Sequence, residues 1–238
     1  MSDRVIFEAA GIDVFYGASQ ILFGVDVSVT EGQTMALLGR NGAGKSTTLK
    51  AIAGIAPPAC GIVRVLGREM QGRKPHVIAR AGIGFVPEDR QVFPEHSVED
   101  NLIIAAKKGP DGQDYWNLAR IYEMFPLLTP LKGRMAGNLS GGEQQMLTIA
   151  RTLMGNPTGL LLDEPSEGLA PVIVERIGEL LRKLRDMGVT VLLAEQNMHF
   201  CLGIASHATV IDKGQIVYRD TIEALRNNDA VKSRYLAL

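Results

Sequence analysis

Residues 39–47, Gly-Arg-Asn-Gly-Ala-Gly-Lys-Ser-Thr, fit the phosphate-loop pattern G-x-x-x-x-G-K-[ST]. The pattern follows an apolar run at 35–38 and precedes a helix predicted over 45–55, so it lies between a strand and a helix. Backbone N–H groups can then surround phosphate oxygens, the lysine adds a mobile positive charge, and the serine hydroxyl is a ligand for Mg²⁺. The alternative, a glycine-rich turn with a surface lysine, is disfavoured by this setting. The predicted phosphate-binding residues are Gly39, Asn41, Gly42, Ala43, Gly44, Lys45, Ser46 and Thr47.

Two carboxylates, Asp163 and Glu164, end a second apolar run at 160–162. Because successive strand side chains point to opposite faces, the two groups can have different tasks at the carboxyl edge of a sheet. Asp163 fits a further Mg²⁺ ligand. Glu164 fits a general base that activates water for attack on a terminal phosphate. Lys45 is predicted to be catalytic as well, through its charge on the β- and γ-phosphates. Alone, an Asp-Glu pair is more often a charge pair at the start of a helix, but the phosphate loop favours the catalytic interpretation.

The string Leu-Ser-Gly-Gly-Glu-Gln-Gln at 139–145 indicates a second helix start with exposed backbone N–H groups. Ser140 can cap the helix, while Gly141 and Gly142 leave those groups unobstructed for an anion. A capped helix with no ligand is the alternative.

Composition excludes several classes of protein. The chain has 238 residues, a net charge of -1 and a pI near 6.4, so it has no broad positive field for a nucleic acid, which we do not expect as a partner. No window is long and apolar enough for a membrane span, and the first residues do not resemble a secretion signal. Cys60 and Cys201 lie far apart, suit a reducing compartment, and are both expected to be buried.

The elements that must position these residues alternate between strands and helices, which is typical of an α/β protein. Residues 89–156 interrupt this alternation with helices, and strands resume after them. Strands are predicted at 5–15, 23–29, 35–38, 62–66, 83–86, 160–163, 189–194, 208–211 and 215–218, and helices at 45–55, 97–108, 115–125, 142–154 and 172–186.

Three motifs in this order resemble the ATP-binding subunits of ABC transporters, and the resemblance extends over nearly the whole chain. It implies an α/β P-loop NTPase core with a mixed sheet, an antiparallel β flank and an inserted helical subdomain. The whole of 1–238 would be one ABC ATPase domain, with a nucleotide-binding core at 1–88 and 157–238 and a helical subdomain carrying the signature at 89–156. It also implies ATP and Mg²⁺ as cofactors.

The resemblance assigns further site residues. Tyr16 matches the aromatic residue that stacks on adenine, although an exposed hairpin tyrosine is the alternative. In the family two chains face each other head to tail, so Ser140, Gly141 and Gly142 would complete the phosphate site of the opposite chain. A lone chain would then lack a complete site.

Three positions depart from the usual family pattern. Glu88 replaces a glutamine, Gln196 replaces the switch histidine, and Ala170 replaces an aspartate. Glu88 keeps an oxygen that can reach Mg²⁺ or its water, and Gln196 keeps an amide that can donate to the γ-phosphate, so we retain the first as a metal ligand and the second as a catalytic residue.

The strings at 86–94 and 163–171, together with Glu-Gln-Asn at 195–197, look like the second ATPase of branched-chain amino acid importers. Urea and short-chain amide importers share these strings in large part, and a non-transport ABC ATPase is a weaker alternative. The implied partners are a second ATPase chain, with a hetero-dimer favoured over a homo-dimer, two membrane-spanning permease subunits and, indirectly, a solute-binding protein. The implied location is peripheral, at the cytoplasmic face of the inner or plasma membrane. Phe93 is expected either to contact a permease or to lie in the core of the helical subdomain.

Overall fold

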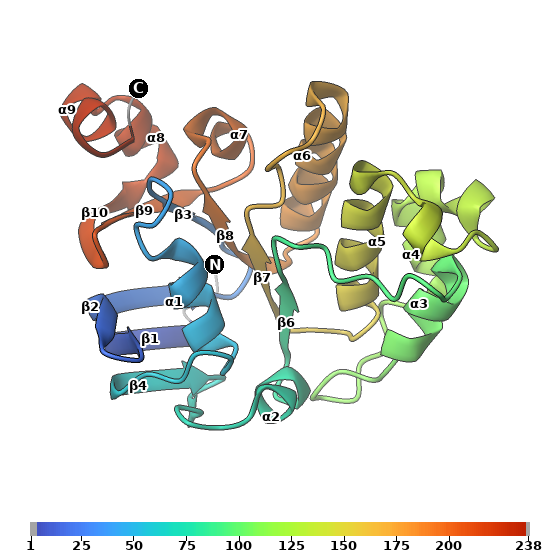
Figure 1. Ribbon diagram of the computed structural model, residues 1–238, viewed down its shortest axis with the longest axis horizontal. Coiled ribbons are helices and arrows are strands. Elements are labelled where there is room, and N and C mark those ends of the chain that lie inside the picture. The colour runs from blue at the N-terminus through green and yellow to red at the C-terminus, as the bar shows by residue number, and fades with distance from the viewer. Residues whose placement is uncertain (1–3, 237–238) are drawn as a thin grey trace.

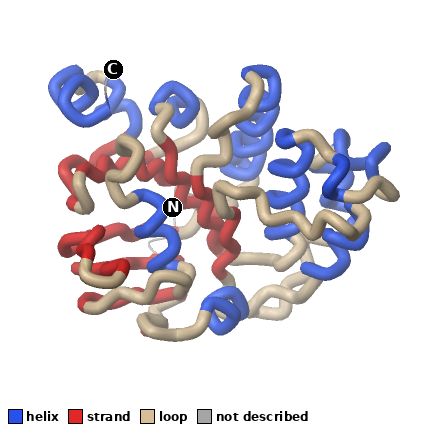
Figure 2. Tube along the Cα trace, viewed as in Figure 1, coloured by secondary structure: helices blue, strands red, loops and turns tan. Residues whose placement is uncertain are grey.

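The structure, a computed structural model, describes residues 4–236 and is centred on a six-stranded sheet (Figures 1 and 2). The strand order is β10-β9-β3-β8-β7-β6, and neighbours are parallel except for the β9–β10 hairpin. The mixed sheet of an α/β protein is therefore confirmed. Its strands are β3 (Thr34–Leu38), β6 (Ile83–Val86), β7 (Gly159–Asp163), β8 (Thr190–Glu195), β9 (His207–Asp212) and β10 (Gln215–Thr221).

A second sheet is antiparallel, has the order β2-β1-β4-β5, and is the expected β flank. Its strands are β1 (Val5–Tyr16), β2 (Ser19–Thr30), β4 (Cys60–Val65) and β5 (Arg68–Glu69). Strand β2 begins earlier than predicted because the chain reverses at Gly17, whose φ of 60° suits a tight hairpin turn.

The burial predicted for the two cysteines is half right. Cys201 is buried, but Cys60 is exposed. Cys60 is the first residue of β4, pairs with Asp13, and precedes the alternation of buried residues that starts further along the strand.

Two hydrophobic cores lie on opposite faces of the six-stranded sheet. Leu37 of β3 joins the core that includes the antiparallel sheet and helix α1 (Lys45–Ile52), whereas its neighbour Leu38 joins the core beneath the remaining helices. This is the two-residue alternation of a strand buried on both faces. The helices that accompany the strands are α2 (Pro75–Arg80), α6 (Pro171–Asp186), α7 (Met198–Leu202), α8 (Ile222–Arg226) and α9 (Asp229–Val231), followed by a π-helical turn at Lys232–Leu236.

Between β6 and β7 the chain forms a group of helices at the right of Figure 1. Side chains cap three of them: Ser97 and Ser140 each form a capping box, with Asp100 and Glu143 respectively, and Asn117 accepts from the backbone of the third. The helices are α3 (Val98–Ala105), α4 (Leu118–Met124) and α5 (Gly141–Leu153), with 3-10 turns at Pro126–Leu131 and Ala136–Asn138.

Buried Asn156 ties the end of this group together. Its Oδ1 accepts from the Trp116 backbone at 2.7 Å, and its Nδ2 donates to the Lys107 and Trp116 carbonyl oxygens at 2.9 and 3.0 Å. The division of the chain into core and helical subdomain stays a prediction. Among residues 4–236, no helix has the length and apolarity to cross a membrane.

Candidate functional site

The phosphate-loop pattern connects β3 to α1, as predicted. Close packing explains two of its glycines. A Cβ at Gly39 would lie 2.4 Å from the Ile211 carbonyl oxygen, and Gly44 combines a φ of +111° with a Cβ position 2.7 Å from Leu22 Cδ2. Side chains at either position would push the loop away from the strands that support it.

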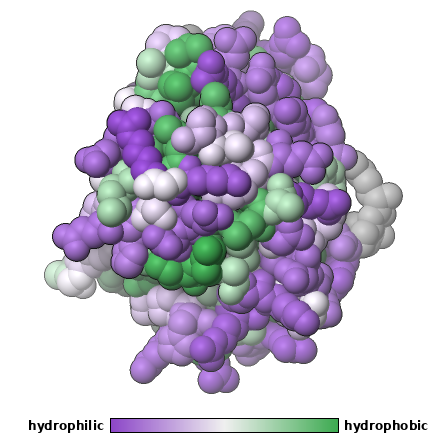
Figure 3. All heavy atoms as spheres, turned by 90° about the vertical axis from the view of Figure 1, so that its right-hand side faces the viewer, coloured by the Kyte–Doolittle hydropathy of each residue, from purple (hydrophilic) through white to green (hydrophobic). Residues whose placement is uncertain are grey.

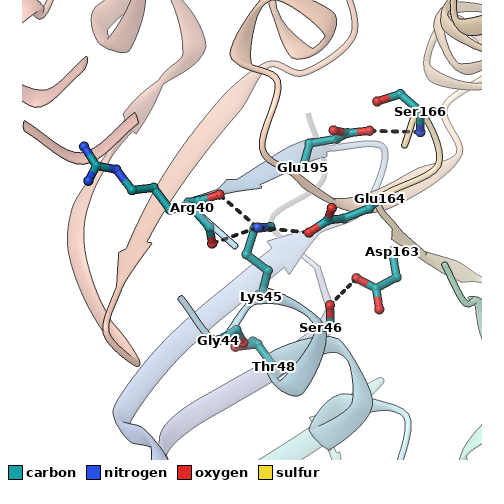
Figure 4. A network of polar contacts seen from close by, with 10 residues as sticks. Arg40, Gly44, Lys45, Ser46, Thr48, Asp163, Glu164, Ser166 and Glu195 are labelled. Atoms are coloured by element: carbon teal, nitrogen blue, oxygen red, sulfur yellow. Dashed lines mark hydrogen bonds and ion pairs between the residues drawn. The ribbon is translucent and has the colours of Figure 1, made fainter. Parts of the chain in front are cut away.

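Lys45 is buried, with 3% exposure, and its ammonium group has three oxygen neighbours (Figure 4). Nζ donates to the Gly39 carbonyl oxygen at 2.8 Å and the Arg40 carbonyl oxygen at 3.1 Å, and it lies 3.0 Å from Glu164 Oε1. An ammonium group has three protons, so these contacts use its full donor capacity. The motifs assign Lys45 to the phosphates and Glu164 to the attacking water, and the structure places the two side chains in direct contact.

Ser46 and Asp163, predicted as Mg²⁺ ligands, also lie together, since Ser46 Oγ donates to Asp163 Oδ1 at 2.9 Å (Figure 4). Burial raises the pKa of Asp163, and the negative charges of Glu164 and Glu88 act in the same direction, while Ser46 and Lys50 lower it. Among residues 4–236 there is no group of three or more His, Cys, Asp or Glu side chains that could hold a metal ion. One carboxylate and a hydroxyl nevertheless fit Mg²⁺, which takes most of its remaining ligands from water and substrate phosphates.

Glu164 has an uncommon backbone conformation, with a φ of +45° immediately after β7. Its N–H donates to the Ala194 carbonyl oxygen at 3.0 Å, and its own carbonyl oxygen accepts from the Glu167 N–H at 3.1 Å. These two bonds hold the turn that directs the carboxylate toward Lys45 (Figure 4).

Sequence reasoning missed two further carboxyl groups, Glu167 and Glu195. A hydrogen bond between Glu167 and Glu164, followed by burial and the charges of Glu164, Glu88 and Glu195, raises the pKa of Glu167 to about 7. Burial alone would raise the pKa of Glu164, but hydrogen bonds from Glu167 and Lys45 leave it below its ordinary value. The spacing of Glu167, three residues after Glu164, was the available signal.

Glu195 lies buried at the end of β8, where its Oε1 accepts from the Ser166 N–H at 3.1 Å (Figure 4). Burial raises the pKa of Glu195, against the hydrogen bonds from Ser166 and Asn197 that lower it. The bond to Ser166 fastens the loop after Glu164 to the neighbouring strand.

Three predicted residues lie exposed around this centre: Glu88 after β6, Gln196 after β8, and Tyr16 at the hairpin end of β1. Glu88 is near enough to raise the pKa values of Asp163 and Glu167. The side chains of Tyr16 and Gln196 make no hydrogen bond to other residues of 4–236, and their roles stay predictions.

The signature string begins α5, one residue earlier than predicted. Ser140 Oγ accepts from the Glu143 N–H, and the Glu143 carboxylate accepts from the Ser140 N–H at 2.7 Å. Gly142 packs against α6, since a Cβ there would lie 2.6 Å from Ile173 Cγ2. Ser140, Gly141 and Gly142 make no hydrogen bond to the phosphate loop of the same chain among the described residues, and their role in the site of a second chain stays a prediction.

A family model described as ABC transporter matches residues 22–167. The chain belongs to this family. As an ABC ATPase it binds and hydrolyses ATP, in agreement with the contact between Lys45 of the phosphate loop and Glu164 after β7.

Among curated ABC proteins, the chain is 44% identical over 226 residues to the high-affinity branched-chain amino acid transport ATP-binding protein BraG of Pseudomonas aeruginosa, covering 94% of this chain and 97% of BraG. It is 36% identical to a probable branched-chain amino acid transport ATP-binding protein, LivF of Archaeoglobus fulgidus, over 90% of this chain and 91% of LivF. It is also 32% identical to LptB, the lipopolysaccharide export system ATP-binding protein of Escherichia coli K12, over 93% of this chain and 92% of LptB.

Solved ABC structures have the same fold. An ATP-binding cassette of an ABC transporter in its ADP conformation superposes with a TM-score of 0.82 at 27% identity, covering 96% of this chain and 97% of the other. A nucleotide-free cassette gives a TM-score of 0.81 at 27% identity, with 95% and 97% covered. The expected ABC ATPase fold is confirmed.

The raised pKa of Glu167 predicts a pH-dependent stability. A carboxyl group that binds its proton more tightly in the folded state stabilises the fold at low pH, and this contribution is lost as the pH rises from about 4.5 through about 7. Glu167→Gln keeps a donor for Glu164 without a proton to lose. We expect the melting temperature of the variant to rise relative to wild type between about pH 5 and about pH 8.

Glu123→Gln, an exposed change on α4, is the control and should give a constant difference across the same range. A constant difference for Glu167→Gln as well would contradict the shared proton.

Proposed function

We propose that this ATPase powers an importer of branched-chain or closely related amino acids. The support is the identity to BraG across almost the full length of both chains, together with the site in which Lys45, Glu164, Ser46 and Asp163 meet. Import of urea or short-chain amides is the main alternative, since the strings around Glu88 and Glu164 are similar there. Export is a further alternative, because the chain is also 32% identical to LptB, the ATP-binding protein of an export system.

In the proposed mechanism, the loop N–H groups from Gly39 to Thr47 and the start of α1 hold the ATP phosphates, and Tyr16 stacks on adenine. Ser46 and Asp163, with Glu88 nearby, would hold Mg²⁺, which supplies charge neutralisation between the phosphates. Gln196 would donate an amide hydrogen bond to the terminal phosphate.

In this mechanism, ATP binding separates Lys45 from Glu164. The three donors of Lys45 already have acceptors, so a phosphate oxygen must replace one of them. Lys45 is one of the groups that lower the pKa of Glu164, so losing this contact would raise that pKa and make the carboxylate a better acceptor for a proton of the attacking water. Substrate binding would therefore release the base.

We further propose that the site is completed by a second ATPase chain facing this one, whose signature supplies the counterpart of Ser140, Gly141 and Gly142. A hetero-dimer is favoured because Gln196 cannot carry a charge and Ala170 lacks a carboxylate, so a partner with a fuller set of groups would provide the stronger site. The complex would include two permease subunits at the cytoplasmic face of the membrane, with a solute-binding protein acting through them.

Phe93 is a candidate contact for a permease. Its ring is 44% exposed, which argues against the alternative that it is subdomain core. The buried side chain of Asn101 accepts from the Phe93 N–H at 2.9 Å and donates to its carbonyl oxygen at 3.0 Å, so the backbone is fixed while the ring faces outward.

Other hydrophobic side chains of the helical group are exposed as well. Figure 3 shows hydrophobic residues gathered across the middle of the face that this group presents. The exposed large hydrophobic residues of the helical group are Phe93, Ile103, Ile104, Tyr115, Leu127 and Met135.

Glu164→Gln tests the catalytic assignment. The amide keeps the shape but cannot accept a proton, so we expect ATP to bind and turnover in the assembled transporter to fall by about 10²-fold or more. Lys45→Ala should lose hydrolysis as well, through weaker phosphate binding. Bound nucleotide and released phosphate are measured side by side, with Glu123→Gln as the control. Wild-type turnover in Glu164→Gln would show that another residue acts as the general base.

Phe93→Asp should weaken assembly with the permease subunits, because a charge would be buried in an apolar contact. Co-purification of the complex measures this, and circular dichroism checks the fold. Phe23→Asp, at a phenylalanine of β2 with 42% exposure, is the matched control and should assemble normally. Normal assembly of Phe93→Asp would remove the docking role.

Counting the ATPase chains in the purified transporter tests the asymmetric pairing. We expect two different chains, and we expect Gln196→Ala to reduce transport less than the corresponding substitution in the partner. Two identical copies of this chain, or an equal loss from both substitutions, would contradict the hetero-dimer.

A further inference from the structure

Arg90 lies two residues after Glu88, where the chain passes from β6 into the helical group. Its backbone has a φ of +62°, and that of Gln91 is also positive at +24°. Helix α5 holds both residues: Thr148 Oγ1 donates to the Arg90 carbonyl oxygen, and Arg151 Nη2 donates to the Gln91 carbonyl oxygen at 2.6 Å. The backbone at this point is therefore fastened to the helix that carries the signature.

The side chain of Arg90 makes contacts in two directions. Its guanidinium group lies against Gly141, where a Cβ would be 2.7 Å from Nη1 and 3.3 Å from Cζ. On its other side, Nη2 donates a long hydrogen bond of 3.4 Å to the Glu167 carbonyl oxygen. One planar group thus joins the start of α5 to the loop that follows Glu164.

Neither an ion pair nor the helix dipole explains this position. A cation beside a helix N-terminus meets the positive end of the helix dipole, which is unfavourable. The nearby Glu143 carboxylate is already engaged in the capping box of α5. Within the described part of the chain, no carboxylate lies at ion-pair distance from Arg90.

The contact with Glu167 leads to the catalytic carboxylate through a single turn. The Glu167 N–H donates to the Glu164 carbonyl oxygen at 3.1 Å, and the Glu167 side chain shares a hydrogen bond with the Glu164 side chain. A shift of α5 would move Arg90 through its backbone contacts, and Arg90 would move the loop at Glu167.

We propose that Arg90 is a positioning residue that sets the loop carrying Glu164 according to the position of the signature helix. The inference rests on the proposed roles of Glu164 and of the signature. Arg90 touches neither ATP nor the reacting atoms in this role, so it changes how fast bound ATP is cleaved and not how tightly it is held. Gly141 leaves room for the guanidinium group, which a side chain at this position would displace.

Steady-state ATP hydrolysis by the assembled transporter tests this role in Arg90→Ala and Arg90→Lys. For Arg90→Ala we expect kcat to fall by about tenfold or more, with KM for ATP within about twofold of wild type. Arg90→Lys should be equally slow, because an ammonium group carries the charge but cannot span the two contacts. Arg120→Ala removes an exposed guanidinium from α4 and should leave both parameters unchanged.

A wild-type kcat in Arg90→Ala would overturn the proposal. Full activity in Arg90→Lys would also overturn it, because the role would then be one of charge alone. A raised KM with unchanged kcat would indicate phosphate binding instead, and a lowered melting temperature or lost assembly would indicate a structural role. Glu164→Gln in the same assay distinguishes a failure of the proposed function from a failure of the role of Arg90. If Glu164→Gln hydrolyses ATP normally, the proposed function fails, and if it is inactive while Arg90→Ala is normal, only the role of Arg90 fails.

Discussion

The ammonium group of Lys45 is the contact on which the rest of this site depends. It brings together the phosphate loop, through the Gly39 and Arg40 carbonyl oxygens, and the end of β7, through Glu164. Both charged side chains are more than nine-tenths buried, and leaving one of such a pair without its partner costs about 3–5 kcal/mol. The loop and the catalytic strand are therefore held in register by one cation.

That cation requires unusual backbone at both of its neighbours. Gly44, immediately before Lys45, has a φ that other residues rarely adopt, and Glu164 itself is left-handed without being glycine. Glycine adopts such a φ without this strain, whereas at Glu164 the conformation costs about 1–3 kcal/mol and persists only where surrounding bonds enforce it. Here the bond from Glu164 to Ala194 and the bond from Ser166 to Glu195 fasten the turn to β8. The parallel order of β3, β8 and β7 places all these strand ends at one edge.

Local motifs made the phosphate loop, Asp163, Glu164 and the capped signature helix predictable from sequence, because each depends on residues close together in the chain. Lys45 and Glu164 lie 119 positions apart in sequence, and their direct contact, which depends on how the sheet is assembled, was not predicted. Glu167 and Glu195 were missed because a carboxyl group near a strand end resembles any surface charge until the sheet brings its neighbours together. Cys60 was misjudged for a related reason: its residue type favours burial, but its position at the first residue of β4 leaves it exposed. The short helix α2 was missed because it has only six residues and begins at a proline.

The charge of the site presents the remaining physical constraint. Asp163, Glu164, Glu167 and Glu195 gather at this edge of the sheet, with Glu88 close enough to influence Asp163 and Glu167. These carboxyl groups outnumber the ammonium groups of Lys45 and Lys50 that act on them, so the edge repels the polyphosphate that it must bind. A proton held by Glu167 removes one negative charge, and a divalent cation held at Ser46 and Asp163 would remove more. The loop N–H groups and the start of α1 add partial positive charge without adding a side chain. The N-terminus of α5 at Ser140 makes no hydrogen bond to the phosphate loop within residues 4–236. This balance of charge supports the proposed closure of the site by the corresponding helix of a facing chain, whose N-terminus would add positive potential beside the carboxylates.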